Sequence, residues 1–128
     1  MRFCQISFLL SFLFVIPFCK VYCMELVNKK NNIDELLKKC DFYVKKNYLD
    51  SALYYYSVVC NSSEKPIDIS EIRKLCYAYI QKSLIYLFYC QDYNQAYENL
   101  NKADILQKRH GLSFPFIYIT YAIFYHKI

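Results

Sequence analysis

Residues 49–60 read LDSALYYYSVVC, and residues 93–106 read YNQAYENLNKADIL. Each stretch places apolar side chains three and four residues apart, the spacing that gathers them on one face of an α-helix. Both follow one template of four positions. A bulky residue at position i is followed by a small one at i+3, a bulky one at i+7 and a small or medium-sized one at i+10. The template is filled by Leu49, Ala52, Tyr56 and Val59, and again by Tyr93, Ala96, Leu100 and Ala103. The chain therefore contains two related amphipathic helices.

Further amphipathic stripes flank these two helices. Residues 33–44 show the helical pattern, and residues 72–87 form a long stripe that is apolar on more than one face, which predicts a helix sandwiched between neighbours. Pro66 lies at the end of a polar loop, and we expect Ser70 to cap the helix after it. Turns are predicted at residues 47–48 and 91–92, and the helix that begins at Tyr93 is expected to close at residues 108–111. A strongly apolar segment, residues 116–128, follows Pro115.

The composition favours an all-helical fold. One glycine and three prolines occur in 128 residues, whereas β-sandwiches and doubly wound α/β folds need many glycine-rich turns. A glycine-rich phosphate loop is excluded for the same reason. The net charge of +5 comes from basic residues scattered among acids, without the clustered basic surface of a nucleic-acid reader. We therefore expect helices joined by short polar turns, and no nucleic-acid binding through this segment.

The N-terminus has the pattern of a secretory signal. After Arg2, residues 6–18 (ISFLLSFLFVIPF) form an uncharged apolar run of thirteen residues. A membrane span needs about 20 apolar residues and a signal core about 7–15, so the signal peptide is the better interpretation. We predict a signal peptide or uncleaved signal anchor over 1–23, a linker over 24–32 and a helical domain over 33–128.

Export would place the protein in the periplasm or cell envelope, held at the membrane through residues 6–18 if the signal is not cleaved. An oxidising compartment permits disulfides among the cysteines that would remain, at positions 40, 60, 76 and 90. Each lies on the apolar stripe of a predicted helix, so buried thiols are the favoured interpretation and disulfide pairing stays open. Their spacing matches no zinc motif, and we expect no metal.

Cys40 and Tyr43 extend the template upstream. Cys40 is a small residue twelve positions before Ala52, and Tyr43 follows it by three. This arrangement resembles the tetratricopeptide repeat (TPR), in which small residues let the two helices of a hairpin approach closely. The resemblance implies helical hairpins of a short right-handed solenoid that binds a protein or peptide.

The second and third repeats depart from the TPR pattern. Leu84 stands twelve positions before Ala96, where a small residue is usual, and Ser83 would serve if the turn carried one extra residue. The two alanines are 44 residues apart, against the usual 34. A third repeat begins with Tyr118, Ala122 and Tyr125 and is incomplete.

A narrower resemblance rests on SALYYYSVVCN (51–61), EIRKLCYAY (71–79), IYLFY (85–89) and DYNQAYENLNKA (92–103). These runs are similar to signal-bearing TPR proteins of gut Bacteroidetes. In that family the TPR array is extracytoplasmic, and many members continue into a transmembrane helix, a coiled coil and a helix-turn-helix domain. The resemblance implies the N-terminal sensor part of a membrane-linked transcriptional regulator, whose regulatory residues this chain lacks.

Residues of the long third helix are the candidate binding residues. In a TPR array the first helix of each hairpin lines the groove, and on this helix that face would carry Gln81, Ile85, Phe88 and Tyr89. Packing against a neighbouring helix is the alternative role for the same side chains. His110 and His126 lie at helix ends, and no catalytic motif accompanies them, so we expect neither an enzyme nor a cofactor.

The sequence thus predicts an extracytoplasmic TPR-like interaction module that binds a protein, a peptide or another copy of itself. Two alternatives remain open. One is a truncated, non-functional fragment of such a regulator, because a solenoid usually needs about three repeats and a polar cap. The other is a small secreted effector with disulfides.

Overall fold

The computed structural model describes residues 32–62, 65–66 and 68–128. The chain divides into two compact units, Met1–Asn32 and Ile33–Ile128, and only the second is described below. The predicted signal (1–23) and all but the last residue of the predicted linker (24–32) lie outside the described residues. Within the described ranges, no helix has the length and apolar character that crossing a membrane requires.

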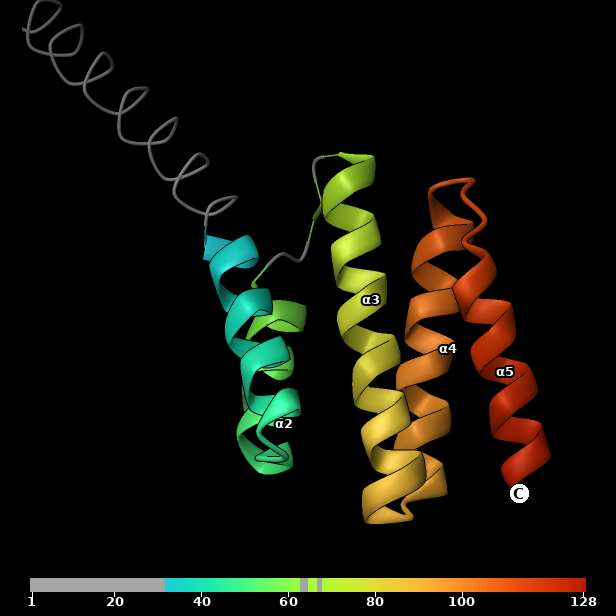
Figure 1. The fold of residues 1–128 in the computed structure, drawn as a ribbon. Coiled ribbons are helices and arrows are strands. Elements are labelled where there is room, and N and C mark those ends of the chain that lie inside the picture. The colour runs from blue at the N-terminus through green and yellow to red at the C-terminus, as the bar shows by residue number, and fades with distance from the viewer. Residues whose placement is uncertain (1–31, 63–64, 67) are drawn as a thin grey trace, which may run out of the picture. The chain divides into compact units, whose positions relative to one another are not determined.

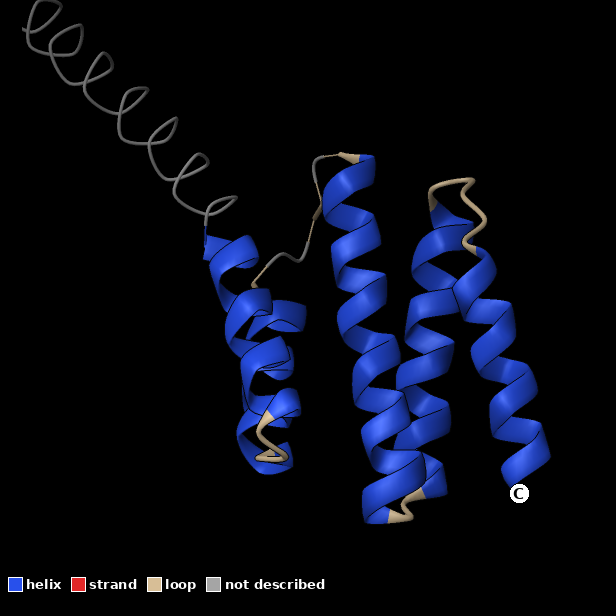
Figure 2. Cartoon of the chain, viewed as in Figure 1, coloured by secondary structure: helices blue, strands red, loops and turns tan. Residues whose placement is uncertain are grey.

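The described unit is built from helices, and no strand occurs in it (Figures 1 and 2). This confirms the predicted all-helical class. Residues 32–45 are helical, and after them come α2 (Leu49–Asn61), α3 (Ile69–Ile85), the π-helical turn η1 (Tyr86–Cys90), α4 (Tyr93–Arg109) and α5 (Pro115–Lys127).

Tight turns join neighbouring helices into hairpins. Asn47 connects residues 32–45 to α2 with φ 61°, and Gln91 connects η1 to α4 with φ 53°. Gly111, at φ 65°, lies in the connection from α4 to α5, in the left-handed region that glycine adopts without a steric penalty. The turns therefore lie where the sequence predicts them, at residues 47–48 and 91–92, and α4 ends at Arg109, within the predicted closing segment 108–111.

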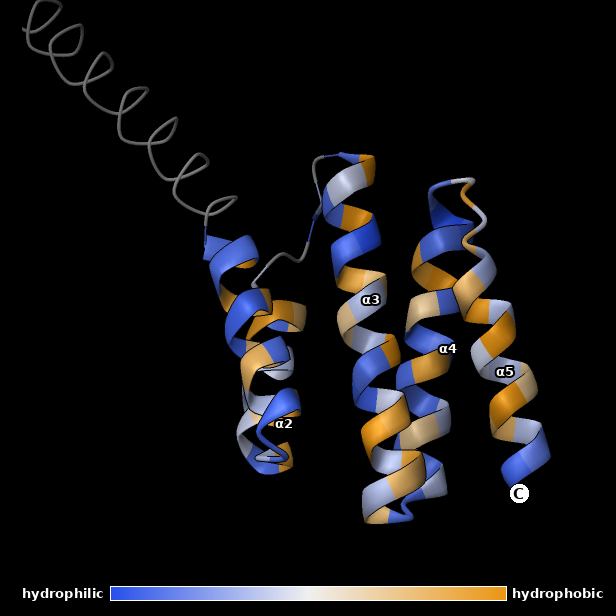
Figure 3. Cartoon of the chain, viewed as in Figure 1, coloured by the Kyte–Doolittle hydropathy of each residue, from blue (hydrophilic) through white to orange (hydrophobic). Residues whose placement is uncertain are grey.

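Helix α3 is shared by two hydrophobic clusters. Its Leu75, Ala78 and Ile85 pack with residues of α2 and of the helix 32–45. Its Ile72, Cys76 and Ile80 pack with residues of α4 and α5. Apolar residues accordingly occur on more than one side of α3 (Figure 3), and the prediction of a helix between neighbours is confirmed.

The predicted N-cap of α3 is wrong by two residues. The N-cap is Asp68, whose carboxylate accepts a hydrogen bond from the backbone N–H of Glu71 at 2.8 Å. Ser70, the predicted cap, is already inside the helix, which begins at Ile69. Both residue types favour N-cap positions, and the extended backbone at Asp68 decides between them.

Most of the predicted repeat positions are buried. The buried positions are Cys40, Ala52, Tyr56, Ala96, Leu100 and Ala103. Tyr43 is half-buried and packs against the first cluster, whereas Tyr93 is exposed. On α5, Ala122 and Tyr125 are also exposed, because the helix packs inward through Ile117 and Phe124.

Candidate binding site

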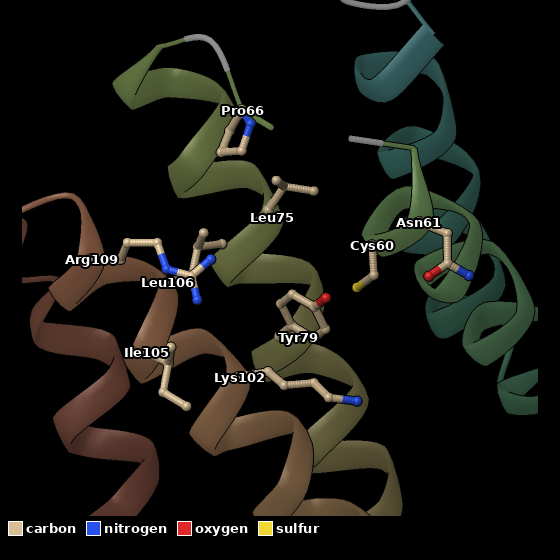
Figure 4. Close-up of a pocket in the computed structure, with 9 residues that line it drawn as sticks. All are labelled: Cys60, Asn61, Pro66, Leu75, Tyr79, Lys102, Ile105, Leu106 and Arg109. Atoms are coloured by element: carbon tan, nitrogen blue, oxygen red, sulfur yellow. The ribbon is translucent and has the colours of Figure 1, made fainter. Parts of the chain in front are cut away.

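A cavity of about 550 Å³ lies where α2, α3 and α4 meet (Figure 4). Its walls come from the end of α2, Pro66, the middle of α3 and the second half of α4. The lining residues are Cys60, Asn61, Pro66, Leu75, Tyr79, Lys102, Ile105, Leu106 and Arg109. The cavity therefore combines a mainly apolar wall with a few polar groups, as small binding sites do.

Both charged residues of this lining are cations, and both come from α4. Lys102 Nζ donates to a Glu98 carboxylate oxygen at 2.6 Å, an exposed pair that raises the pKa of Lys102. The Arg109 guanidinium has no ion pair or hydrogen bond within the part of the chain that the structure describes. The cavity wall thus offers one unpaired cation and one that is held only by a surface contact.

The α2 side of the cavity carries a thiol. Burial raises the pKa of Cys60 to about 11, and the nearby ammonium groups of Lys82 and Lys102 partly offset that effect. At neutral pH Cys60 is therefore a protonated thiol. Figure 4 shows its sulfur turned toward the cavity, across from Tyr79 and Lys102.

The four predicted binding residues occupy different environments. Ile85 is buried in the first hydrophobic cluster, so its side chain packs between helices, and Gln81 is half-buried. Phe88 and Tyr89 are 47% and 64% exposed. The alternative role, packing, therefore describes Ile85, whereas binding through Phe88 and Tyr89 stays a prediction.

Helix α5 carries exposed apolar side chains, and its last turn lies beside Phe88. Lys127 Nζ lies 5.9 Å from the centroid of the Phe88 ring, which places the end of α5 next to η1. Ile119, Ile123 and Lys127 stand four residues apart and so share one side of α5. Ile119 is 59% and Ile123 is 37% exposed. We call Phe88, Tyr89, Ile119 and Ile123 the Phe88 surface.

The thiols depart from the sequence prediction at one position. All four cysteines beyond residue 32 are free; Cys40, Cys60 and Cys76 are buried as expected, and Cys90 is exposed at the end of η1. Among the residues that the structure describes, no group of three or more His, Cys, Asp and Glu side chains is placed to hold a metal ion.

Sequence reasoning missed the cavity. Lys102 and Arg109 are seven residues apart, which places them two turns apart on one side of a helix. That spacing is visible in the sequence, but the facing residues of α2 and α3 are not. Searches of protein-family models, curated proteins and solved structures find no match to this chain.

Proposed function

We propose that residues 33–128 are a TPR-like interaction module that binds a protein or peptide segment on the Phe88 surface. The observation that carries the proposal is the exposure of Phe88, Tyr89, Ile119 and Ile123 on elements joined by the Phe88–Lys127 contact. Exposed apolar side chains gathered on one surface are typical of interaction sites. Aromatic residues are enriched in such interfaces.

The TPR resemblance supports the same surface. Helices α3 and α5 would be the first helices of the second and third hairpins, and first helices line the groove in that family. Phe88 and Tyr89 continue α3, whereas Ile119 and Ile123 belong to α5. The Phe88 surface therefore includes Phe88 and Tyr89, two of the four residues that the resemblance places on the groove.

Peptide selection tests the proposal. The full chain serves as bait for a displayed random-peptide library, and calorimetry measures the selected peptides. We expect saturable binding at one site, weakened at least tenfold by the double change Phe88→Ser and Ile123→Ser, because both contacts lose their apolar area. Tyr54→Ser is the control, since Tyr54 is an exposed aromatic on α2, away from the Phe88 surface. Failure to select any binder, or equal loss in the control, would refute the proposal.

The proposal also includes a localisation outside the cytoplasm. This part rests on the sequence of residues 1–23 alone. Intact-mass measurement of the protein from its own cell tests this part. A mass that corresponds to a chain beginning at Met24 would support export with cleavage. Recovery of the uncleaved chain in the soluble cytoplasmic fraction would contradict it.

A further inference from the structure

We propose that the cavity between α2, α3 and α4 is a second peptide site, which takes an extended segment with two acidic residues three positions apart and apolar residues between them. This inference rests on the proposed function in one respect, that the ligand is a polypeptide. It uses different side chains from the Phe88 surface, so the two proposals can fail separately.

The charge of the cavity selects an anionic ligand. Lys102 and Arg109 are the charged members of its lining. Lys82 lies close enough to Cys60 to act on its pKa and adds a third cation near the α2 side. Among the described residues, the acid in contact with these cations is Glu98, which is paired with Lys102. A ligand carboxylate would therefore meet more positive than negative charge.

The distance between the two cations sets the distance that should separate the two acidic residues of the ligand. Seven residues of α-helix rise about 10.5 Å, so Lys102 and Arg109 stand about that far apart along α4. An extended chain in the polyproline II conformation has three residues per turn and rises about 3.1 Å per residue. Acidic residues at positions i and i+3 of such a chain lie on one side, about 9.3 Å apart. One carboxylate would then reach each cation.

The part of the cavity wall between the two cations determines which residues the ligand should carry between its two acids. Ile105 and Leu106 lie between Lys102 and Arg109 along α4, and Leu75 of α3 lines the same cavity (Figure 4). This wall is apolar and suits one large aliphatic side chain of the ligand. A cavity of about 550 Å³ holds a few side chains, so a short peptide fits it better than the broad surface of a membrane.

Three synthetic peptides test the chemistry. The probe is acetyl-Ala-Glu-Leu-Pro-Glu-Ala-amide, whose acids are three positions apart. A permuted peptide, acetyl-Ala-Leu-Glu-Glu-Pro-Ala-amide, has the same composition with adjacent acids, and a neutral version replaces both Glu by Gln. We expect calorimetry on the full chain to give binding of the probe that weakens with added salt. The permuted peptide should bind at least tenfold more weakly, and the neutral peptide weaker still.

Matched variants locate the binding. The double change Lys102→Glu and Arg109→Glu should reduce probe affinity at least tenfold, because both carboxylates then face like charge. The double change Lys38→Glu and Lys45→Glu alters net charge equally at exposed positions on the helix 32–45 and should leave affinity unchanged. Thermal melts followed by circular dichroism check that every variant is folded. The neutral changes Lys102→Gln and Arg109→Gln provide a second pair if the charge reversal unfolds the chain.

Several results would overturn this proposal while leaving the Phe88 surface untouched. They are no binding of the probe, equal binding of the permuted peptide, or equal loss in the Lys38 and Lys45 variant. Binding to anionic phosphatidylglycerol vesicles without binding to the probe would also overturn it and assign the cations to a lipid headgroup. Loss of probe binding in the Phe88→Ser and Ile123→Ser variant alone would place the acidic peptide on the other surface.

Discussion

Ser83 Oγ donates a hydrogen bond to the carbonyl oxygen of Ala96 at 2.7 Å, and both residues are fully buried. This contact closes the α3–α4 hairpin at a point where each helix presents a small side chain. Ser83 and Ala96 are thirteen residues apart, whereas Cys40 and Ala52 are twelve apart. The π-helical turn η1, which lies between Ser83 and Ala96, accommodates one more residue than an α-helical turn.

Removing the Ser83 hydroxyl should therefore destabilise the hairpin. We expect Ser83→Ala to lower the free energy of unfolding by about 1 kcal/mol, because the Ala96 carbonyl keeps its helical partner and loses a second one. Ser83→Leu should cost more, about 1–3 kcal/mol, since the side chain would push α3 and α4 apart. Urea unfolding measures both changes. Ser57→Ala is the control, because Ser57 bonds only to Leu53 within its own helix.

The extra residue of η1 predicts which deletions the fold tolerates. Deleting the exposed Phe88 leaves Leu87 in its buried place and brings the Ser83–Ala96 separation to twelve. We expect this variant to keep its helical circular dichroism and a cooperative melt. Deleting Ala78 instead, inside regular α3, rotates every later side chain by about 100° and moves Ile80, Ser83 and Ile85 out of the core. Equal damage from the two deletions would contradict this account of η1.

Gln107 is a buried polar residue that fixes the connection to α5. Its Oε1 accepts a hydrogen bond from the backbone N–H of Phe114 at 2.7 Å, and its Nε2 donates to Asp104 Oδ1 at 2.8 Å. Asp104 Oδ2 in turn accepts from Lys108 Nζ at 2.7 Å. The chain of contacts holds the segment before α5 against the end of α4.

Replacing Gln107 by Met should be costly although the shapes are similar. The change leaves the buried N–H of Phe114 without its acceptor, which costs about 1–3 kcal/mol. Urea unfolding gives this value, and hydrogen exchange should show faster exchange at Phe114. Gln95→Met is the matched control, because the Gln95 side chain is exposed. A Gln107 variant as stable as that control would mean that the connection is held by apolar contacts alone.

The helices and their turns were predictable because they depend on local patterns. The three- and four-residue spacing of apolar side chains located the helices, and Asn47, Gln91 and Gly111 lie in the predicted turns. The same logic failed where two local signals were equivalent. Asp68 and Ser70 are both good N-cap residues, and only the extended backbone at Asp68 decides between them.

The candidate sites were less predictable, because they join residues from separate helices. Ile85 and Phe88 stand three residues apart and read as one face, but the turn from α3 into η1 leaves Ile85 buried and Phe88 exposed. Lys102 and Arg109 do not indicate a binding site until Leu75 and Cys60 are known to line the same cavity. Cys90 is outside the core because the helical stripe that predicted its burial ends in η1.

The four free cysteines beyond residue 32 should differ in reactivity. Burial raises the pKa of Cys40 and of Cys76 to about 12, and both side chains are fully buried. Because the thiolate is the nucleophile, these two thiols should react with iodoacetamide at pH 8 only as fast as the chain unfolds. Cys90 is exposed and should react at once. Mass spectrometry of the alkylated peptides checks the order, and early labelling of Cys76 would contradict the packing of α3 against α4.

The same buried thiols make stability depend on alkaline pH. An unfolded thiol has a pKa of 9.0, and burial raises that of Cys40 and Cys76 to about 12 and that of Cys60 to about 11. Between these values the folded chain holds more protons than the unfolded chain, so the free energy of unfolding falls as pH rises. The stability that the protonated thiols contribute is fully present below about pH 9 and is lost progressively up to about pH 12. Burial also raises the pKa of Tyr121 to about 12, which adds to the loss at the upper end of this range.

Urea unfolding at a series of pH values measures this dependence, and cysteine variants identify its source. Replacing Cys40, Cys60 and Cys76 by Ala should flatten the fall in stability just above pH 9, because the groups with raised pKa are gone. Cys90→Ala should leave the slope unchanged, since Cys90 is exposed. A triple variant that keeps the full slope would assign the alkaline loss to the buried phenols, among which burial raises the pKa of Tyr56 furthest.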